Sequence, residues 1–142
     1  MINQLSVFIQ NSSGRLAAVT KILADANVNI RALSVADSTD FGILRLIVSN
    51  LDDATDALKA NNRIFDITPV IGVSIADTPG GLAKIAQLMA DNNVDIEYFY
   101  AFVSHAKDGA YLVLRVQQPE TAVSILEQNG FTLLCEEDIK TL

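Results

Sequence analysis

The chain has 142 residues, of which 50% are hydrophobic and 19% charged, so it can bury one average core or two small ones and is too apolar for long disorder. No apolar run approaches the ~18 residues of a membrane span, and residues 1–4 do not begin a basic and then apolar leader, so we expect neither a membrane segment nor a signal peptide. The formal net charge of −7 repels phosphate backbones and disfavours nucleic acid as a partner.

The first half of the chain predicts six elements. Alternating apolar residues over 5–9 predict a strand, and apolar residues at helical spacing predict a helix over 16–26. Ser, Asn and Gly in the turn between them suit a helix N-terminus, and Asn27 suits a left-handed helix end. The remaining elements are expected as strands at Ile30–Asp37 and Ile43–Val48, a helix that begins at Asp52-Asp53, and a strand near Phe65–Thr68.

The second half repeats the first. Ten of 26 positions are identical between Leu5–Ile30 and Ile71–Ile96 without a gap, and the match resumes after a two-residue insertion. We therefore predict two copies of one domain, residues 1–68 and 69–142, joined near Thr68-Pro69. The later elements of the second copy are expected at Ile96–Val103, Tyr111–Val116, a helix from Pro119-Glu120 that Gly130 stops, and a strand near Phe131–Glu136.

The order βαββαβ in each copy predicts an α+β fold of two ferredoxin-like plaits, each an antiparallel sheet with its helices on one face. The second strand of each copy then lies at a sheet edge. Its unpaired amides need a partner, and the simplest partner is the same edge of another copy, in this chain or in another subunit.

The turn between the first strand and the first helix is the best candidate site in each copy. Gly14 and Gly80 allow a ligand to approach the backbone, and the helix amides that follow favour an anion such as a carboxylate. Asn11 and Asp77 precede these glycines, and Asn29 and Asp95 precede the edge strands. A small zwitterion could place its carboxylate on the amides and its ammonium on these oxygens. The same residues could equally be ordinary turn and cap residues.

Two segments then carry a family resemblance. Asn11-Ser12-Ser13-Gly14-Arg15-Leu16 with Val28-Asn29-Ile30, and Asp77-Thr78-Pro79-Gly80-Gly81-Leu82 with Val94-Asp95-Ile96, resemble the signature of ACT domains, which are small amino-acid-binding regulatory modules. The usual pattern has Pro-Gly-x-Leu at the helix start and asparagine before the second strand. Ser13 replaces the proline in the first copy, and Asp95 replaces the asparagine in the second.

This resemblance, which covers nearly the whole chain as a tandem pair, implies an amino-acid effector held between two copies. The residues that would contact it are Asn11, Ser12, Ser13, Gly14, Arg15, Leu16, Asn29 and Ile30 in the first copy, and Asp77, Thr78, Pro79, Gly80, Gly81, Leu82, Asp95 and Ile96 in the second. It further implies a non-catalytic regulatory protein that forms a homodimer and acts on a metabolic enzyme partner. Two alternatives stay open, a structural interaction module without a ligand and a small enzyme on the same fold.

Other residues carry weaker signals. His105 is expected in an exposed hairpin loop, and Cys135 as a buried small residue in an apolar strand; one cysteine excludes an internal disulfide and fits a cytoplasmic location. Arg31 could pair a ligand carboxylate or form a salt bridge. No phosphate-binding loop or metal-ligand cluster is visible, so we expect no catalytic residues, metal or cofactor.

Overall fold

The computed structural model describes residues 1–10, 12–37, 40–103 and 109–142. The chain divides into two compact units. The N-terminal unit comprises residues 3–68 and 137–142, and the C-terminal unit comprises residues 1–2 and 69–136. Each unit therefore holds the repeat of one half of the chain and a short terminal segment from the other half.

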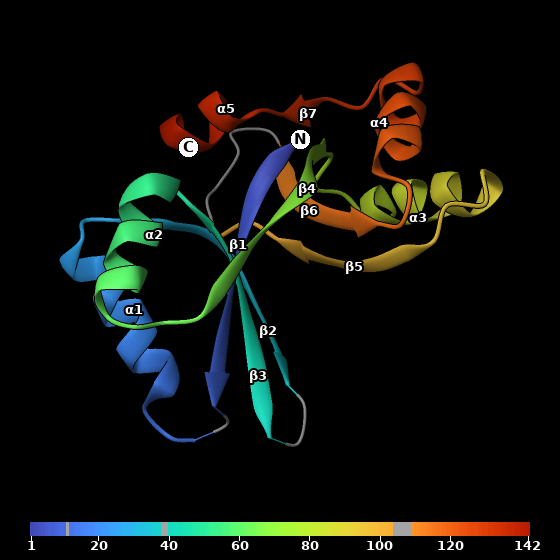
Figure 1. The fold of residues 1–142 in the computed structure, drawn as a ribbon. Helices are drawn as coiled ribbons and strands as arrows, with labels where there is room; N and C mark the ends of the chain where they lie inside the picture. The colour runs from blue at the N-terminus through green and yellow to red at the C-terminus, as the bar shows by residue number, and fades with distance from the viewer. Residues whose placement is uncertain (11, 38–39, 104–108) are drawn as a thin grey trace. The chain divides into compact units, whose positions relative to one another are not determined.

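The N-terminal unit is a four-stranded sheet with two helices (Figure 1). Its strand order is β2-β3-β1-β4, and both β1 and β2 pair antiparallel with β3. The register places Gln10 opposite Phe41 at one end of the sheet and Ile30 opposite Val48 at the other. The elements are β1 (Ile2–Gln10), α1 (Arg15–Asp25), β2 (Ile30–Asp37), β3 (Phe41–Val48), α2 (Leu51–Ala60) and the first residues of β4 (Phe65–Ile75).

The C-terminal unit repeats this topology. Its strand order is β5-β6-β4-β7, so β4 takes the place of β1, and β7 takes the place that the start of β4 has in the N-terminal unit. The elements are α3 (Gly81–Asp91), β5 (Ile96–Ala101), β6 (Ala110–Val116), α4 (Pro119–Gln128) and β7 (Leu133–Leu134).

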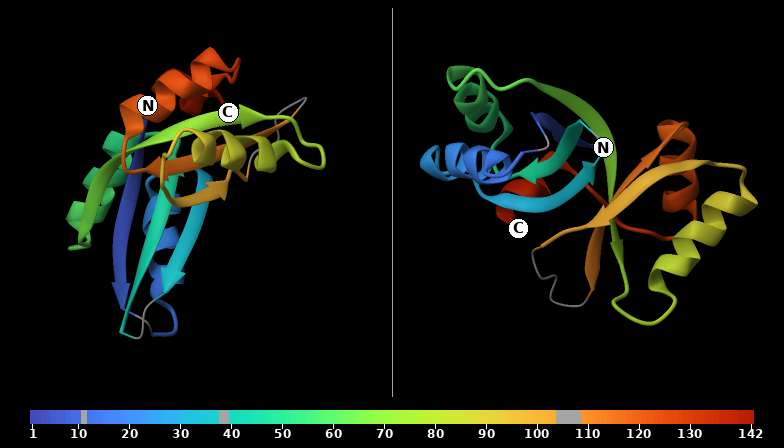
Figure 2. Two further views of the ribbon diagram at one scale, coloured as in Figure 1. Left: turned by 90° about the vertical axis from the view of Figure 1, so that its right-hand side faces the viewer. Right: turned by 90° about the horizontal axis from the view of Figure 1, so that it is seen from below.

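Both helices of each unit lie on one side of its strands (Figure 2), and the core forms between these two layers. In the N-terminal unit Leu5 and Val7 of β1 pack with Val19 and Leu23 of α1, and all four are fully buried. The C-terminal unit has an equivalent core around Val73, Ile85 and Met89. The predicted fold class, two ferredoxin-like plaits, is confirmed. No helix in the described ranges is long and apolar enough to cross a membrane.

The predicted edge strands are also confirmed, because among the described strands β2 pairs with β3 alone and β5 pairs with β6 alone. These edges carry large apolar side chains that the helices do not cover. Leu33, Val35 and Phe99 are 43%, 48% and 47% exposed.

The helix ends agree with the sequence, but the helix starts do not. Asn27 and Asn93 adopt φ of 55° and 54°, and Gly130 adopts φ of 79°, as expected for left-handed helix ends. At the starts of α1 and α3 no side chain caps the helix; Gly14 and Gly80 occupy the N-cap positions with φ of 84° and 89°. The expectation that the turn side chains cap these helices is therefore wrong.

The C-terminus differs from the prediction as well. The expected strand over Phe131–Glu136 shortens to β7, and the terminal residues form a short helix, α5 (Glu136–Thr141). Ile139 of α5 is only 2% exposed, and Arg31 donates hydrogen bonds of 3.2 Å to the carbonyl oxygens of Ile139 and Lys140. This helix is stabilised by the N-terminal unit, from residues more than one hundred positions away.

Candidate functional site

The loop between β1 and α1 in the N-terminal unit is organised by Arg15. Its Nε donates to Ser12 Oγ at 3.2 Å, and its Nη2 donates to Gln10 Oε1 at 3.0 Å. The backbone N–H of Ser12 donates to the Gln10 carbonyl at 2.8 Å. These bonds hold a guanidinium over the loop at the start of the helix. Asn11, the first predicted site residue, lies outside the described residues.

The first turn of α1 presents backbone donors. Within the described chain the amides of Leu16 and Ala17 have no acceptor, because α1 begins at Arg15 and Gly14 offers no side chain. The side chain of Leu16 is 44% exposed, so it lies outside the core in which the helical spacing placed it. A helix N-terminus with a cation beside it favours a carboxylate.

The corresponding loop in the C-terminal unit has different chemistry. The Gly81 amide donates to the Thr78 carbonyl at 2.9 Å, and a Cβ at Gly81 would overlap the carbonyl oxygen of Ala76. Pro79 immediately precedes Gly80, which is the N-cap of α3. Asp77 is exposed, and nothing cationic replaces Arg15 there because its counterpart is Gly81. A carboxylate is therefore less favoured at this loop than at the first.

The residues before β2 and β5 form the second part of each predicted site. Asn29 is fixed by two reciprocal 2.9 Å bonds, from its N–H to Ser49 Oγ and from the Ser49 N–H to its carbonyl. Asp95 accepts only a 3.4 Å backbone bond from the Gln117 N–H among the described residues. Both side chains are exposed, Asn29 as a neutral amide and Asp95 as an acid, with Ile30 and Ile96 half-buried behind them.

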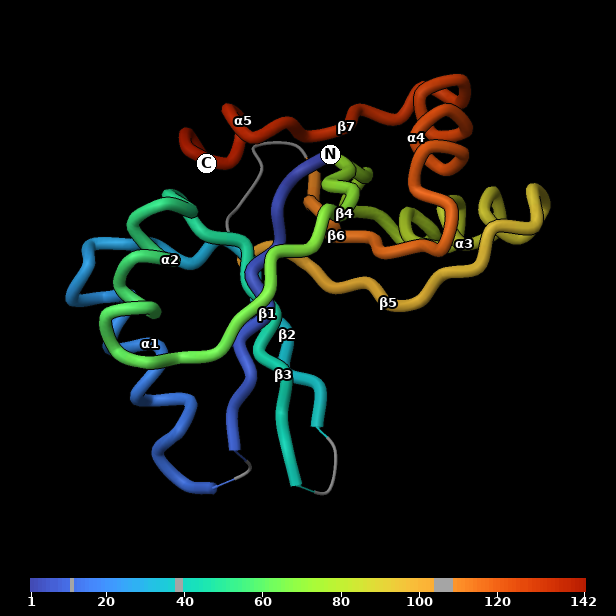
Figure 3. Tube along the Cα trace, viewed as in Figure 1, coloured from blue at the N-terminus to red at the C-terminus, as the bar shows by residue number. Residues whose placement is uncertain are grey.

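The two parts of each predicted site lie at opposite ends of the same plait (Figure 3). Gln10, before the loop, pairs with Phe41 at one end of β3, whereas Ile30 pairs with Val48 at the other. The 11 residues of α1 separate the two ends by about 16 Å at 1.5 Å per residue. A small amino acid cannot span that distance, so neither unit brings its own loop and edge-strand residues together.

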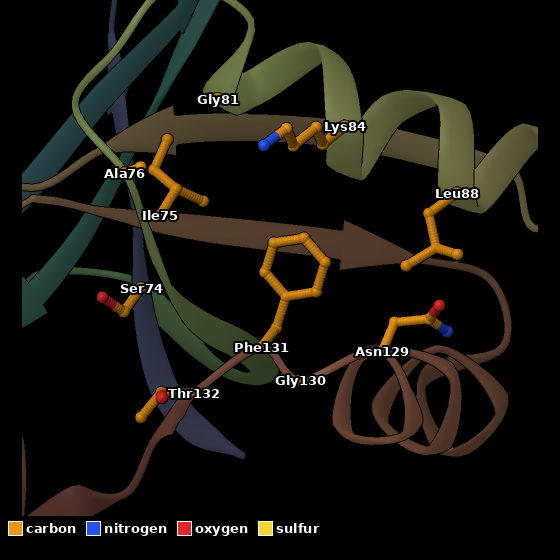
Figure 4. Close-up of a pocket in the computed structure, with 10 residues that line it drawn as sticks. All are labelled: Ser74, Ile75, Ala76, Gly81, Lys84, Leu88, Asn129, Gly130, Phe131 and Thr132. Carbon is orange, nitrogen blue, oxygen red and sulfur yellow. The ribbon is translucent and has the colours of Figure 1, made fainter.

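Sequence reasoning missed a cavity of about 570 Å³ in the C-terminal unit (Figure 4). It lies between the first half of α3, the end of the central strand β4, and the segment that links α4 to β7. The lining residues are Ser74, Ile75, Ala76, Gly81, Lys84, Leu88, Asn129, Gly130, Phe131 and Thr132. No local sequence motif predicts this cavity, because its residues come from three separate stretches of the chain.

Of the residues with weaker sequence signals, the described ones do not join either loop site. Arg31 bonds α5 and does not point to a loop site, and Cys135 is exposed instead of buried. His105 lies outside the described residues. The described parts of the chain hold no group of three or more His, Cys, Asp or Glu side chains arranged for a metal ion.

Comparisons with known proteins place these features in context. Residues 1–142 match the family model described as an ACT domain pair. A crystal structure of a protein from Bacteroides thetaiotaomicron superposes with a TM-score of 0.90 at 40% identity, covering 99% of this chain and 96% of the other.

The regulatory subunit of aspartate kinase is similar in fold. The ligand-free subunit from Thermus thermophilus has a TM-score of 0.63 at 18% identity, covering 89% of this chain and 90% of the other. The subunit from Thermus flavus has a TM-score of 0.59 at 19% identity over the same shares. No curated protein is significantly similar to the chain.

Proposed function

Because the chain belongs to the family of ACT domain pairs, which are regulatory modules, we propose that it binds a small L-amino acid between two plaits and acts as a regulator without catalysis. One observation carries this proposal. In each plait the strand-to-helix loop lies at one end and the polar start of the edge strand lies at the other. A complete site therefore requires two plaits.

The charges of the two copies favour one pairing over the other. The loop of the N-terminal unit supplies free amides and Arg15 for a carboxylate. The start of β5 supplies Asp95, whose carboxylate would bind an ammonium more strongly than the neutral amide of Asn29. The opposite pairing places Asp77 near the ligand carboxylate, which is unfavourable.

We therefore assign the working site to the Ser12–Leu16 loop of one plait and Asp95 of another. A pair of plaits then holds one strong site and one weak site. Leu16 of the loop and Ile96 beside Asp95 supply apolar surface for the side chain of the effector.

The edges of the sheets support association between copies. Unpaired strand edges with exposed Leu33, Val35 and Phe99 are unfavourable in an isolated plait, and docking a second copy there satisfies amides and buries apolar surface. We propose a homodimer formed through these edges, with its effector in the cytoplasm, where the exposed thiol of Cys135 stays reduced.

Regulation requires that the effector bind one arrangement more tightly than another. An effector that joins a loop of one plait to the edge strand of another stabilises the associated form. The fold similarity to an aspartate kinase regulatory subunit makes a metabolic enzyme the kind of partner we propose.

Calorimetric titration of the full chain with each of the twenty L-amino acids tests the proposal. We expect saturable binding of one or a few of them. The affinity should fall at least tenfold in Asp95→Asn and in Arg15→Ala, because each substitution removes a charge-assisted hydrogen bond. Asp77→Asn is the matched control, because it removes the same charge from the weak site.

Absence of binding by every amino acid refutes the proposal. An equal loss of amino-acid affinity in Asp77→Asn and in Asp95→Asn refutes the assignment of the working site. An effect on a partner protein that no amino acid changes supports the structural interaction module instead.

A further inference from the structure

Arg63 of the N-terminal unit has a buried donor without an acceptor. Its side chain is half-buried, and its Nε atom is buried with no hydrogen-bond partner among the described residues. No described carboxylate lies within ion-pair distance of it, because the ion pairs in the described ranges involve Lys21, Arg115 and Lys140. A buried charged donor without an acceptor is rare and unfavourable, and a bound anion would satisfy it.

The C-terminal unit shows which space Arg63 enters. Its counterpart there is Phe131, because each N–H donates to the carbonyl oxygen five residues earlier, at 2.9 Å and 3.0 Å. Each also follows a residue with left-handed backbone, Asn62 with φ of 54° and Gly130 with φ of 79°. Figure 4 shows the Phe131 ring in the cavity beside α3. The side chain of Arg63 therefore occupies the equivalent space beside α1.

The alternation of side chains supports this placement. Phe65, two residues after Arg63, packs against the core of the N-terminal unit, whereas the intervening Ile64 is 73% exposed. Since alternate residues of an extended segment share a face, Arg63 lies on the side of Phe65, which is the side that α1 covers.

One face of α1 borders the same space. The cavity of the C-terminal unit is lined by Gly81 and Lys84 of α3, and the matching positions of α1 are Arg15 and Ala18. The short side chain of Ala18 leaves room for Arg63. Arg15 brings a second guanidinium to the start of this face, about 4.5 Å along the helix from Ala18 at 1.5 Å per residue.

Neither guanidinium has an acidic partner. The two acceptors of Arg15 are the neutral side chains of Ser12 and Gln10, and no described group accepts from Arg63 Nε. The chain has 17 acidic and 10 basic residues, so most cations could find a carboxylate. The second copy has Gly81 and Phe131 at these two positions, which shows that the plait does not need cations there.

The charges of the working site then define the effector. The amides of Leu16 and Ala17, with Arg15, favour the α-carboxylate, and Asp95 of another plait favours the α-ammonium. Arg63 is left for a second anionic group, and a guanidinium binds a carboxylate through two parallel hydrogen bonds. An amino acid with an acidic side chain carries all three groups.

We propose that the effector is an acidic L-amino acid, glutamate or aspartate, whose side-chain carboxylate binds Arg63. This inference rests on the amino-acid site proposed above and adds its specificity. The opposite pairing of plaits has Gly81 and Phe131 in place of the two guanidiniums, so the weak site lacks this preference.

Calorimetric titration of the full chain with L-glutamate, L-glutamine, L-aspartate and L-asparagine tests the proposal, because each acid has nearly the same size as its amide. We expect at least one acid to bind about tenfold more tightly than its amide at low salt, where charges are least screened. Arg63→Met should abolish this preference and leave the affinity for the amide near that of the unaltered chain. Lys21→Met, which removes an exposed cation of the same unit, should leave the preference unchanged.

A second variant and a second ligand separate charge from folding and from simple anion binding. Arg63→Lys keeps the charge but not the paired hydrogen bonds, so it should retain part of the preference. Both variants keep an aliphatic side chain in the space, and their unfolding temperatures should lie near that of the unaltered chain. The dicarboxylate without an ammonium, glutarate for glutamate or succinate for aspartate, should bind about tenfold more weakly because nothing pairs Asp95.

Three results would overturn this inference. They are an amide that binds as tightly as its acid, a preference for the acid that Arg63→Met leaves intact, and a dicarboxylate that binds as tightly as the acidic amino acid. The first two leave the proposed amino-acid site in place. Absence of binding by every amino acid would instead refute the proposed function, and this inference with it.

Discussion

Substitution of the adjacent glycines 80 and 81 separates two physical requirements of the loop before α3. A Cβ at Gly81 would overlap the carbonyl oxygen of Ala76, so Gly81→Ala must move backbone at the helix start. A Cβ at Gly80 meets nothing within 4 Å, but its φ of 89° is unfavourable for alanine. We expect the free energy of unfolding to fall by about 3 kcal/mol in Gly81→Ala, the upper end of overpacking costs, and by about 1 kcal/mol in Gly80→Ala.

Thermal unfolding followed by circular dichroism measures both. For a chain of this length, about 3 kcal/mol corresponds to a decrease of roughly 10 °C in unfolding temperature, and about 1 kcal/mol to roughly 3 °C. Asparagine, which tolerates left-handed backbone, should recover most of the loss at position 80 and none at 81. Equal losses for the two alanine variants, or recovery by asparagine at 81, would refute the distinction between space and backbone angle.

Three further outcomes follow from particular contacts. Arg31→Ala removes two hydrogen bonds to α5, so we expect about 1–2 kcal/mol of local destabilisation and faster hydrogen exchange at the Ile139 amide; unchanged exchange would contradict the anchoring role. Asn93→Ala should cost about 1 kcal/mol in denaturant unfolding and Asn93→Gly almost nothing, because φ is 54°; equal costs would show that the backbone angle is not the cause. Leu33→Lys with Phe99→Lys should leave the fold intact and weaken self-association in sedimentation velocity, and an unchanged dimer would exclude the strand edges as its interface.

Features that depend on local chemistry were predictable from the sequence. The left-handed residues Asn27, Asn93 and Gly130 stand at helix ends because few other residues tolerate that backbone. The βαββαβ order followed from apolar periodicity, and the edge positions of β2 and β5 followed from the chirality of the crossovers.

Features that depend on distant partners were not predictable. A six-residue helix such as α5 is unstable alone, and its acidic residues are typical of a solvent-exposed segment. Burial of Ile139 and the hydrogen bonds from Arg31 stabilise it. The cavity around Phe131 escaped detection for the same reason, since three segments build it.

The candidate site is an intermediate case. The loop motif was visible in the sequence, but Ser12 was expected to cap the helix, whereas its hydroxyl accepts from Arg15. The separation of the loop from Asn29 by the length of α1 became clear only from the strand register. That separation is the reason to propose a site made from two plaits.

Backbone NMR of the ¹⁵N-labelled chain, titrated with each L-amino acid, tests the central claim most directly. We predict that one or a few amino acids shift the amide signals of Leu16, Ala17 and Asp95 together, in a saturable manner. Binding that moves none of these three signals, or no shift with any amino acid up to about 10 mM, far weaker than a useful affinity, would contradict the account.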